Sequence, residues 1–172
     1  MIKDELIILR LVWHSSDFDS DGNLKGSAFR SDDLRPDKEK DDTPKFVSTD
    51  RVDMIFKPSI DWRIEYQQSD GKREKMERFE ARFAEFKCAE LRSVERGGRR
   101  QFDVTAEPEP AGADGPGSPE NQAHCALRHV SGFTGSKGAV RSYVEYLRTQ
   151  LIKKTRAIHS YGAIFPLVGR AN

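Results

Sequence analysis

The chain has 172 residues, 36% of them apolar and 33% charged, with a formal net charge of +1. This length suits one domain with a modest core, and near-neutrality excludes an overall electrostatic preference for nucleic acid or acidic partners. The two cysteines, Cys88 and Cys125, form no CxxC pair, and no apolar run is long enough for a signal-peptide core or a membrane span. We therefore expect a reduced, cytoplasmic protein without a membrane segment.

Four short runs rich in branched and aromatic residues predict the strands of one sheet. In chain order they are Glu5–Trp13, Phe46–Thr49, Gln101–Thr105 and Cys125–Val130. Gly138–Ile158 predicts a long amphipathic helix, because its apolar residues recur at steps of three and four. We therefore predict a single α+β domain with a mainly antiparallel sheet and this helix packed on one face. The apolar stripe of the helix consists of Val140, Tyr143, Val144, Leu147 and Leu151.

Other segments leave the secondary structure open. Val52–Pro58 and Ile60–Tyr66 suit irregular or helical packing, although alternating apolar residues in the second also permit a strand. Gly71–Glu95 favours a helix in its first half, while residues 81–95 remain open between helix and strand. The apolar tail Tyr161–Val168 is expected to dock as a last strand or as coil.

Two segments have the composition of loops. Residues 31–45 are rich in acidic side chains and predict a mobile, solvated loop. Residues 107–120 contain four prolines and three glycines, with little apolar surface to offset the entropy of ordering. We interpret this second segment as a flexible insertion within the domain.

A glycine-rich corner, residues 132–138, precedes the long helix and is the first candidate site. Backbone N–H groups at a helix N-terminus attract anions, and glycines allow a phosphate to approach closely. Gly135, Ser136 and Lys137 are the candidate ligand-binding residues of this corner. The spacing differs from that of a Walker loop, and Ser136 is equally suited to capping the helix.

The same helix is strongly basic. Between Arg128 and Arg156 there are seven basic residues and one acid, Glu145. Such a helix can neutralise phosphates, although Glu145 could also pair with neighbouring arginines on a solvated face. The candidate residues for binding a phosphate-bearing or acidic partner are Arg141, Arg148 and Lys153.

Three fragments together resemble small bacterial or phage proteins of uncharacterised function. They read DG-x3-GSAF at residues 21–29, VSTDR at residues 47–51 and P-x-N-x-x-H at residues 119–124. The resemblance implies one α+β unit and no particular activity.

A second resemblance concerns the N-terminal half. Leu9-Arg10-Leu11-Val12, followed by Phe46-Val47-Ser48-Thr49, is similar to the arginine strand and the Ser-Thr strand of ADP-ribosyltransferases. The resemblance implies NAD as cosubstrate, with Arg10 on an NAD phosphate and Ser48 supporting the nicotinamide site. It also implies a catalytic glutamate on a later strand, for which Glu80, Glu85 and Glu90 are the candidates.

His124, Cys125 and His129 form a further candidate group, with Asn121 shortly before them. His124 is expected to organise a loop or to occupy a polar core position, and a Cys–His nucleophile is a possible alternative. Tetrahedral zinc requires four ligands and no second ligand pair is evident, so we predict no metal site.

These observations lead to two main hypotheses. The first is a non-enzymatic binding module whose basic helix and glycine corner hold a nucleotide, a nucleic acid or an acidic protein, without a cofactor. The second is an NAD-consuming enzyme of the ADP-ribosyltransferase type that uses Arg10 and Ser48. A third possibility is a subunit of a bacterial defence or toxin–antitoxin complex, and the sequence leaves the oligomeric state open.

Overall fold

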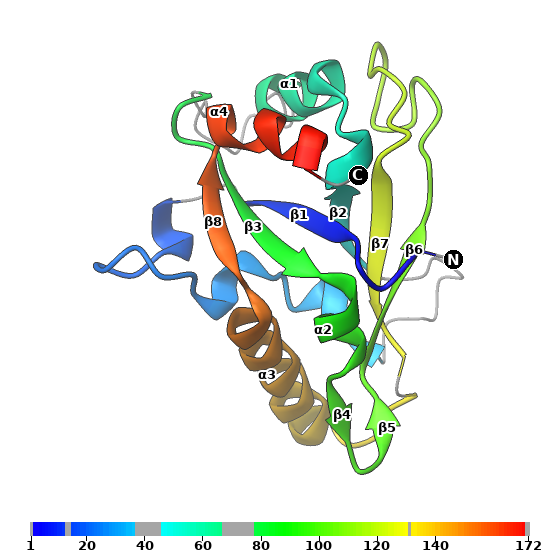
Figure 1. Ribbon diagram of the computed structural model, residues 1–172. Coiled ribbons are helices and arrows are strands. Elements are labelled where there is room, and N and C mark those ends of the chain that lie inside the picture. Colours follow the sequence, from blue (N-terminus) through cyan, green and yellow to red (C-terminus); the bar gives the residue numbers. More distant parts are fainter. Residues whose placement is uncertain (1, 13–14, 37–45, 67–77, 131, 171–172) are drawn as a thin grey trace.

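A computed structural model describes residues 2–12, 15–36, 46–66, 78–130 and 132–170. Its centre is a six-stranded sheet with the order β6-β7-β2-β1-β3-β8 (Figure 1), in which every pair of neighbours is antiparallel. This arrangement confirms the predicted α+β class and the four predicted strands. The strands are β1 (Ile7–Val12), β2 (Val47–Arg51), β3 (Arg82–Lys87), β6 (Phe102–Ala106), β7 (His124–His129) and β8 (Ala157–Ser160), beside a hairpin of β4 (Glu95–Arg96) and β5 (Arg99–Arg100).

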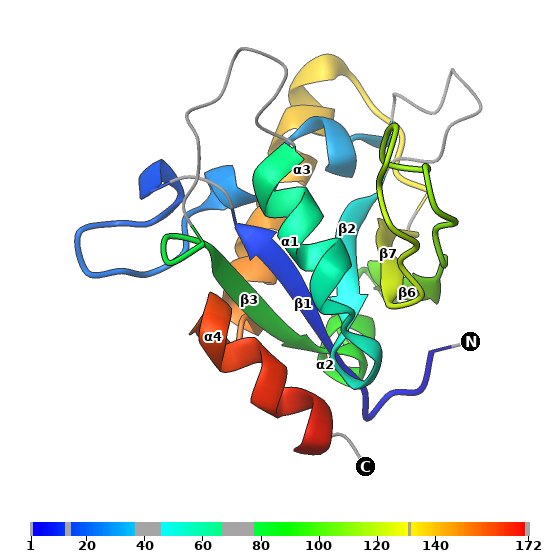
Figure 2. The ribbon, with the colours of Figure 1, turned by 90° about the horizontal axis from the view of Figure 1, so that it is seen from above.

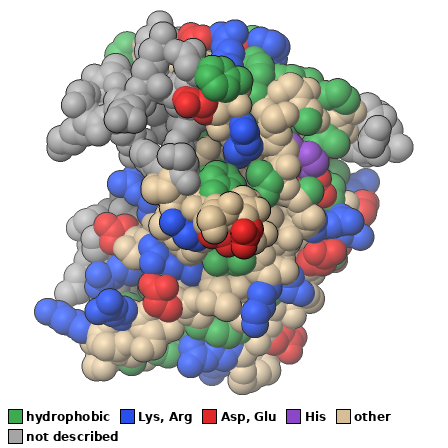
Figure 3. Space-filling model, turned by 90° about the vertical axis from the view of Figure 1, so that its left-hand side faces the viewer, with side chains coloured by type: hydrophobic (Ala, Val, Ile, Leu, Met, Phe, Trp, Pro, Cys, Tyr) green, Lys and Arg blue, Asp and Glu red, His purple; other side chains and the backbone are tan. Residues whose placement is uncertain are grey.

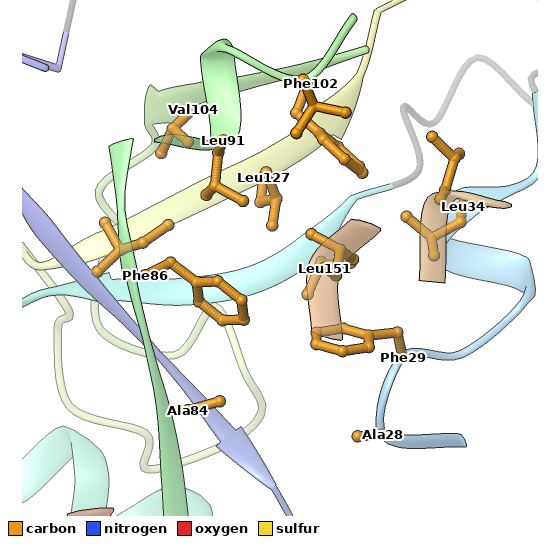
Figure 4. Close-up of a cluster of buried hydrophobic side chains, with 14 of the residues drawn as sticks. Ala28, Phe29, Leu34, Ala84, Phe86, Leu91, Phe102, Val104, Leu127 and Leu151 are labelled. Carbon is orange, nitrogen blue, oxygen red and sulfur yellow. The ribbon is translucent and has the colours of Figure 1, made fainter. Parts of the chain in front are cut away.

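Helix α3 (Lys137–Lys154) covers one face of the sheet and encloses the larger core. Its first turn is capped by Ser136, whose side chain accepts a hydrogen bond from the backbone N–H of Ala139. All five residues of the predicted apolar stripe are buried. Figure 4 shows Leu151 of this helix facing Phe29 and the side chains that project from the sheet, Phe86 and Leu127 among them.

The opposite face of the sheet is covered by α1 (Lys57–Tyr66), α4 (Tyr161–Ile164) and η6 (Phe165–Arg170), which lie across it in Figure 2. A second apolar cluster fills this interface, built on Leu9, Leu11, Phe83, Ile60, Ile64 and Ile164. The remaining short helices are η1 (Ser15–Asp17), η2 (Gly26–Ala28), η3 (Asp32–Leu34), η5 (Val52–Met54) and α2 (Cys88–Arg92). No helix in the described ranges is both long and apolar enough to cross a membrane.

The structure resolves the open assignments and corrects two predictions at the C-terminus. Within the segment left open, residues 82–87 form a strand and residues 88–92 a short helix, and residues 57–66 also form a helix. Residues 71–77, where a helix was expected, lie outside the described residues. The long helix ends at Lys154 rather than at Ile158, because the chain turns there and Arg156 donates its backbone N–H to Glu85 as β8 joins the sheet edge. The tail from Tyr161 is helical, since Tyr161, Ile164 and Phe165 share the side that packs on the second cluster.

The two predicted loops differ in what the structure describes. Most of the acidic loop, residues 37–45, lies outside the described residues, while Leu34 at its start is fully buried. The Pro/Gly-rich segment 107–120 extends the β6–β7 hairpin. Its backbone is bonded in both directions between Glu109 and Asn121, at 3.0 and 2.8 Å.

Candidate functional site

A pocket lies where β1 and β2 separate. The two strands pair only at Ile8–Arg51 and Leu9–Asp50, and their ladder ends there. Arg10, the next residue of β1, extends its guanidinium across the gap and donates a 3.0 Å hydrogen bond from Nη1 to the carbonyl of Ser48. The side chain of Arg10 thus bridges the strands where the backbone ladder no longer does.

The pocket has a volume of about 260 Å³. This volume lies just below the ~300–1,000 Å³ typical of small-molecule sites, so the pocket could enclose one end of a larger ligand. Its walls are strongly polar and carry both signs of charge. The lining residues are Arg10, Leu11, Arg30, Asp33, Phe46, Ser48, Arg63, Glu109, Asp114 and His124.

One wall is built from Ser48, His124 and Glu109. Nε2 of His124 lies 3.1 Å from Oγ of Ser48 and 3.4 Å from Oε1 of Glu109. Nδ1 of the same ring lies 2.8 Å from the carbonyl oxygen of Glu107. A carbonyl can only accept, so Nδ1 carries a proton and Nε2 is the nitrogen that gains or loses one.

The Pro/Gly-rich loop brings Glu109 to this wall. The loop lies beside α1 in Figures 1 and 2, and a Cβ placed at Gly115 would be 3.6 Å from Cη2 of Trp62. Gly115 has φ +129°, a conformation that other residues rarely adopt. The loop is therefore joined across its base by the Glu109–Asn121 bridge, and a side chain at Gly115 would meet Trp62 of α1.

One of the lining residues, Arg63, belongs to a buried ion pair. Nη2 of Arg63, on α1, donates to Oδ2 of Asp50, on β2, at 2.5 Å, and both side chains are at least 93% buried. Nδ2 of Asn121 donates to the other carboxylate oxygen of Asp50 at 2.9 Å, and Oδ1 of Asn121 accepts from the backbone of Ala123. Asn121 therefore supports the ion pair and does not line the pocket.

Burial and nearby charges shift the pKa values of Arg10 and Glu109. Burial lowers the pKa of Arg10, with Asp33 as the main opposing charge, although an arginine stays protonated in any case. Burial raises the pKa of Glu109, and the attraction of His124 offsets this only in part. Arg63 acts on both groups, and it lines the same pocket as Arg10 and Glu109.

Two buried nitrogens of the pocket arginines lack protein partners. Nε of Arg10 and Nε of Arg63 make no hydrogen bond within the described part of the chain. Buried donors are nearly always satisfied, so each such case calls for an explanation. Both nitrogens are shielded from solvent, so they mark a cost of burying the two arginines.

The residues proposed on the basic helix lie away from this pocket. Lys137, Arg141 and Lys153 are exposed, whereas Arg148 donates to the carbonyl of Phe29 at 2.8 Å and to Glu145 at 2.8 Å. Sixteen helical positions separate Lys137 from Lys153, which places them on nearly opposite sides of an α-helix with 3.6 residues per turn. On the face shown in Figure 3, basic side chains are interspersed with acidic ones. Gly135 is exposed beside the Ser136 cap.

The glutamates proposed from the sequence have other surroundings. Glu85 lies 2.7 Å from Nε2 of His159 on β8, and Glu90 is 4.0 Å from Arg156. Neither they nor Glu80 line the pocket. Cys125 is fully buried, and burial raises the pKa of its thiol to about 12, which argues against a thiolate nucleophile. Within the described ranges, no three His, Cys, Asp or Glu side chains are grouped as metal ligands.

Sequence reasoning found Arg10, Ser48 and His124 but missed Arg63 and Glu109. Glu107 and Glu109 form a Glu-x-Glu pair directly after β6, and this spacing could have identified Glu109. The proline-rich composition around the pair concealed it. Arg63 gave no signal, because a lone arginine in a helix is ordinarily exposed.

Comparison of the chain with protein-family models, with curated proteins and with solved structures found no match.

Proposed function

We propose that the pocket between β1 and β2 binds NAD and that the protein cleaves it, as an NAD-consuming enzyme of the ADP-ribosyltransferase type. The observation that carries the proposal is the convergence of Arg10, Ser48 and Glu109 on one pocket. These residues come from β1, from β2 and from the loop after β6. They correspond in kind and order to the arginine, the Ser-Thr strand and the later glutamate that the resemblance implies.

The charge distribution supports a ligand with a phosphate at one end. Guanidinium groups bind phosphate oxygens through paired, charge-assisted hydrogen bonds. Arg10, Arg30 and Arg63 line the pocket and supply guanidinium groups for this purpose. The pocket also contains carboxylates, which suit the hydroxyl groups of a ribose better than a second phosphate.

The chemistry assigned to Glu109 is electrostatic. Cleavage of the N-glycosidic bond breaks the bond between the ribose carbon and the nicotinamide nitrogen, and nicotinamide leaves as a neutral molecule. The ribose carbon becomes cationic in the transition state, as in glycoside hydrolysis, where a nearby carboxylate stabilises it. Water or an acceptor nucleophile then forms the new bond to that carbon and releases a proton.

Calorimetric titration with NAD tests the binding step. We expect saturable binding by the wild-type protein and markedly weaker binding of nicotinamide riboside, which lacks the pyrophosphate. Equal affinity for the two compounds, or no heat with NAD at millimolar concentration, would remove the basis of the proposal.

The non-enzymatic alternative uses the exposed cations Lys137, Arg141 and Lys153 of α3 to bind a nucleic acid or an acidic protein partner. This alternative stays a prediction. Arg148 adds little to it, because its guanidinium already donates to Glu145 and to the carbonyl of Phe29. Salt-sensitive binding of an oligonucleotide that Arg141→Gln weakens and Arg10→Gln leaves unchanged would favour this alternative.

A further inference from the structure

We infer that His124 is a positioning residue that shares one proton with Glu109 and holds the carboxylate beside the Ser48 hydroxyl. The inference rests on the proposed function for its kinetic consequence. The coupling between the two side chains is a property of the protein alone and can be measured without NAD.

The geometry of the imidazole ring carries the argument. The carbonyl of Glu107 keeps a proton on Nδ1, and Nε2 faces both Ser48 Oγ and Glu109 Oε1. When Nε2 is protonated, it can donate to the Glu109 carboxylate. When Nε2 is bare, it can accept from Ser48, but its lone pair then faces the oxygen of Glu109.

The ring has little freedom to leave this position. His124 is 2% exposed, and its ring meets that of Phe46 edge-on, with centroids 5.7 Å apart. Its own backbone carbonyl accepts from the N–H of Glu107 at 3.0 Å. The histidine is thus bonded through its backbone to the segment that carries Glu109.

Several charges surround this pair. The main ones that act on Glu109, besides His124, are Asp114 of the same loop, Arg63 of α1 and Asp50 of β2. Arg63 and Asp50 are paired with each other, and Asp114 adds a like charge beside Glu109. The carboxylate of Glu107 also acts on His124, and Arg10, Arg30 and Asp33 line the rest of the pocket.

The Glu109 carboxylate is held in place when it is ionised and Nε2 of His124 carries a proton. In acid, the carboxylate gains a proton and loses its attraction for the cationic ribose carbon. In alkali, His124 loses the proton that orients the carboxylate. We expect a bell-shaped pH dependence of kcat, and little change in KM on altering His124, because the phosphates are bound at the Arg10 end of the pocket.

The variant His124→Gln separates positioning from packing. The glutamine amide donates hydrogen bonds without titrating, so we expect it to retain activity and to abolish the alkaline limb of the profile while the acid limb remains. His124→Leu should lower kcat by about 10²-fold, the effect of misplacing a catalytic group by about 1 Å. His129→Gln is the matched control, since His129 is on the same strand and does not line the pocket. It should leave the profile unchanged.

Histidine ¹⁵N NMR of the wild type and of Glu109→Gln provides the direct test. We expect Nδ1 of His124 to stay protonated throughout and its Nε2 titration midpoint to move to lower pH in Glu109→Gln, because the variant removes the anion. If the wild type cleaves NAD but the midpoint is the same in Glu109→Gln, the inference about His124 is wrong. If the midpoint moves in Glu109→Gln but the wild type does not cleave NAD, the proposed function is wrong and the shared proton still holds.

Discussion

The hydroxyl of Ser48 lies 3.1 Å from Nε2 of His124, although 76 positions separate the two residues in the chain. The sheet register explains this contact. Ser48 pairs with Ala126 and Asp50 pairs with His124 across β2 and β7, so Ser48 and His124 are diagonal neighbours on the same face. The Ser-Thr strand and the histidine strand therefore form one wall of the pocket through ordinary antiparallel pairing.

Arg10 should determine affinity for the phosphates of NAD. Charge-assisted hydrogen bonds contribute about 1.5–3 kcal/mol, so Arg10→Gln should weaken NAD binding by roughly 10- to 100-fold. Arg141→Gln is the matched control, because Arg141 is an exposed arginine of α3 outside the pocket lining. Calorimetric titration of both variants provides the comparison. Equal losses in the two would contradict a phosphate site at Arg10.

Asp50 should be important for stability because it neutralises Arg63 inside the protein. The two side chains are 2% and 7% exposed, and removing one partner of a buried ion pair costs about 3–5 kcal/mol. We expect Asp50→Asn to lower the free energy of unfolding by that amount in urea denaturation. The exposed pair Lys57–Asp61 offers a comparison, and Lys57→Gln should change stability by less than about 1 kcal/mol.

Glu109 should make stability depend on pH. Burial raises the pKa of Glu109 in the folded state, so the folded protein binds this proton more tightly than the unfolded chain does. Its contribution is complete below the ordinary glutamate pKa and is lost as the pH rises through the raised value. Relative to the wild type, Glu109→Gln should therefore be more stable at pH 7 than at pH 4. Denaturation curves at the two pH values measure this difference, and the opposite trend would exclude a desolvated carboxyl.

Leu147 should anchor α3 to the sheet. It is fully buried in the larger core, and Leu-to-Ala changes at such sites cost about 2–5 kcal/mol. We expect Leu147→Ala to fall in this range by thermal or urea unfolding. Ser142→Ala, on the exposed side of the same helix, should change stability by no more than about 0.5 kcal/mol.

The sequence predicted the fold well where the patterns were periodic. The stripe from Val140 to Leu151 and the four β-rich runs carried the α+β class, because burial imposes those periods directly. Strand β3 was ambiguous, since Phe83 and Phe86 suit both a strand and a helix. The C-terminal strand β8 was absorbed into the helix prediction, because only the edge of β3, which is distant in sequence, determines that the chain turns there.

The site was less predictable for a physical reason. A pocket forms where β1 and β2 separate, and a separation of strands has no sequence signature. Arg10 and Ser48 were identified by resemblance, but Arg63 and Glu109 reach the pocket from α1 and from a loop whose composition suggested mobility. Their roles depend on tertiary structure, such as the Asp50–Arg63 pair and the position of Gly115 beside Trp62.

Release of nicotinamide from NAD tests the central claim most directly. Chromatographic assay of the wild-type protein and of Glu109→Gln should show steady release by the first and a loss of about 10²-fold or more in the second, with NAD affinity retained. If the wild type releases no nicotinamide, or if Glu109→Gln releases it at the wild-type rate, the assignment of this pocket as an NAD-cleaving site is wrong.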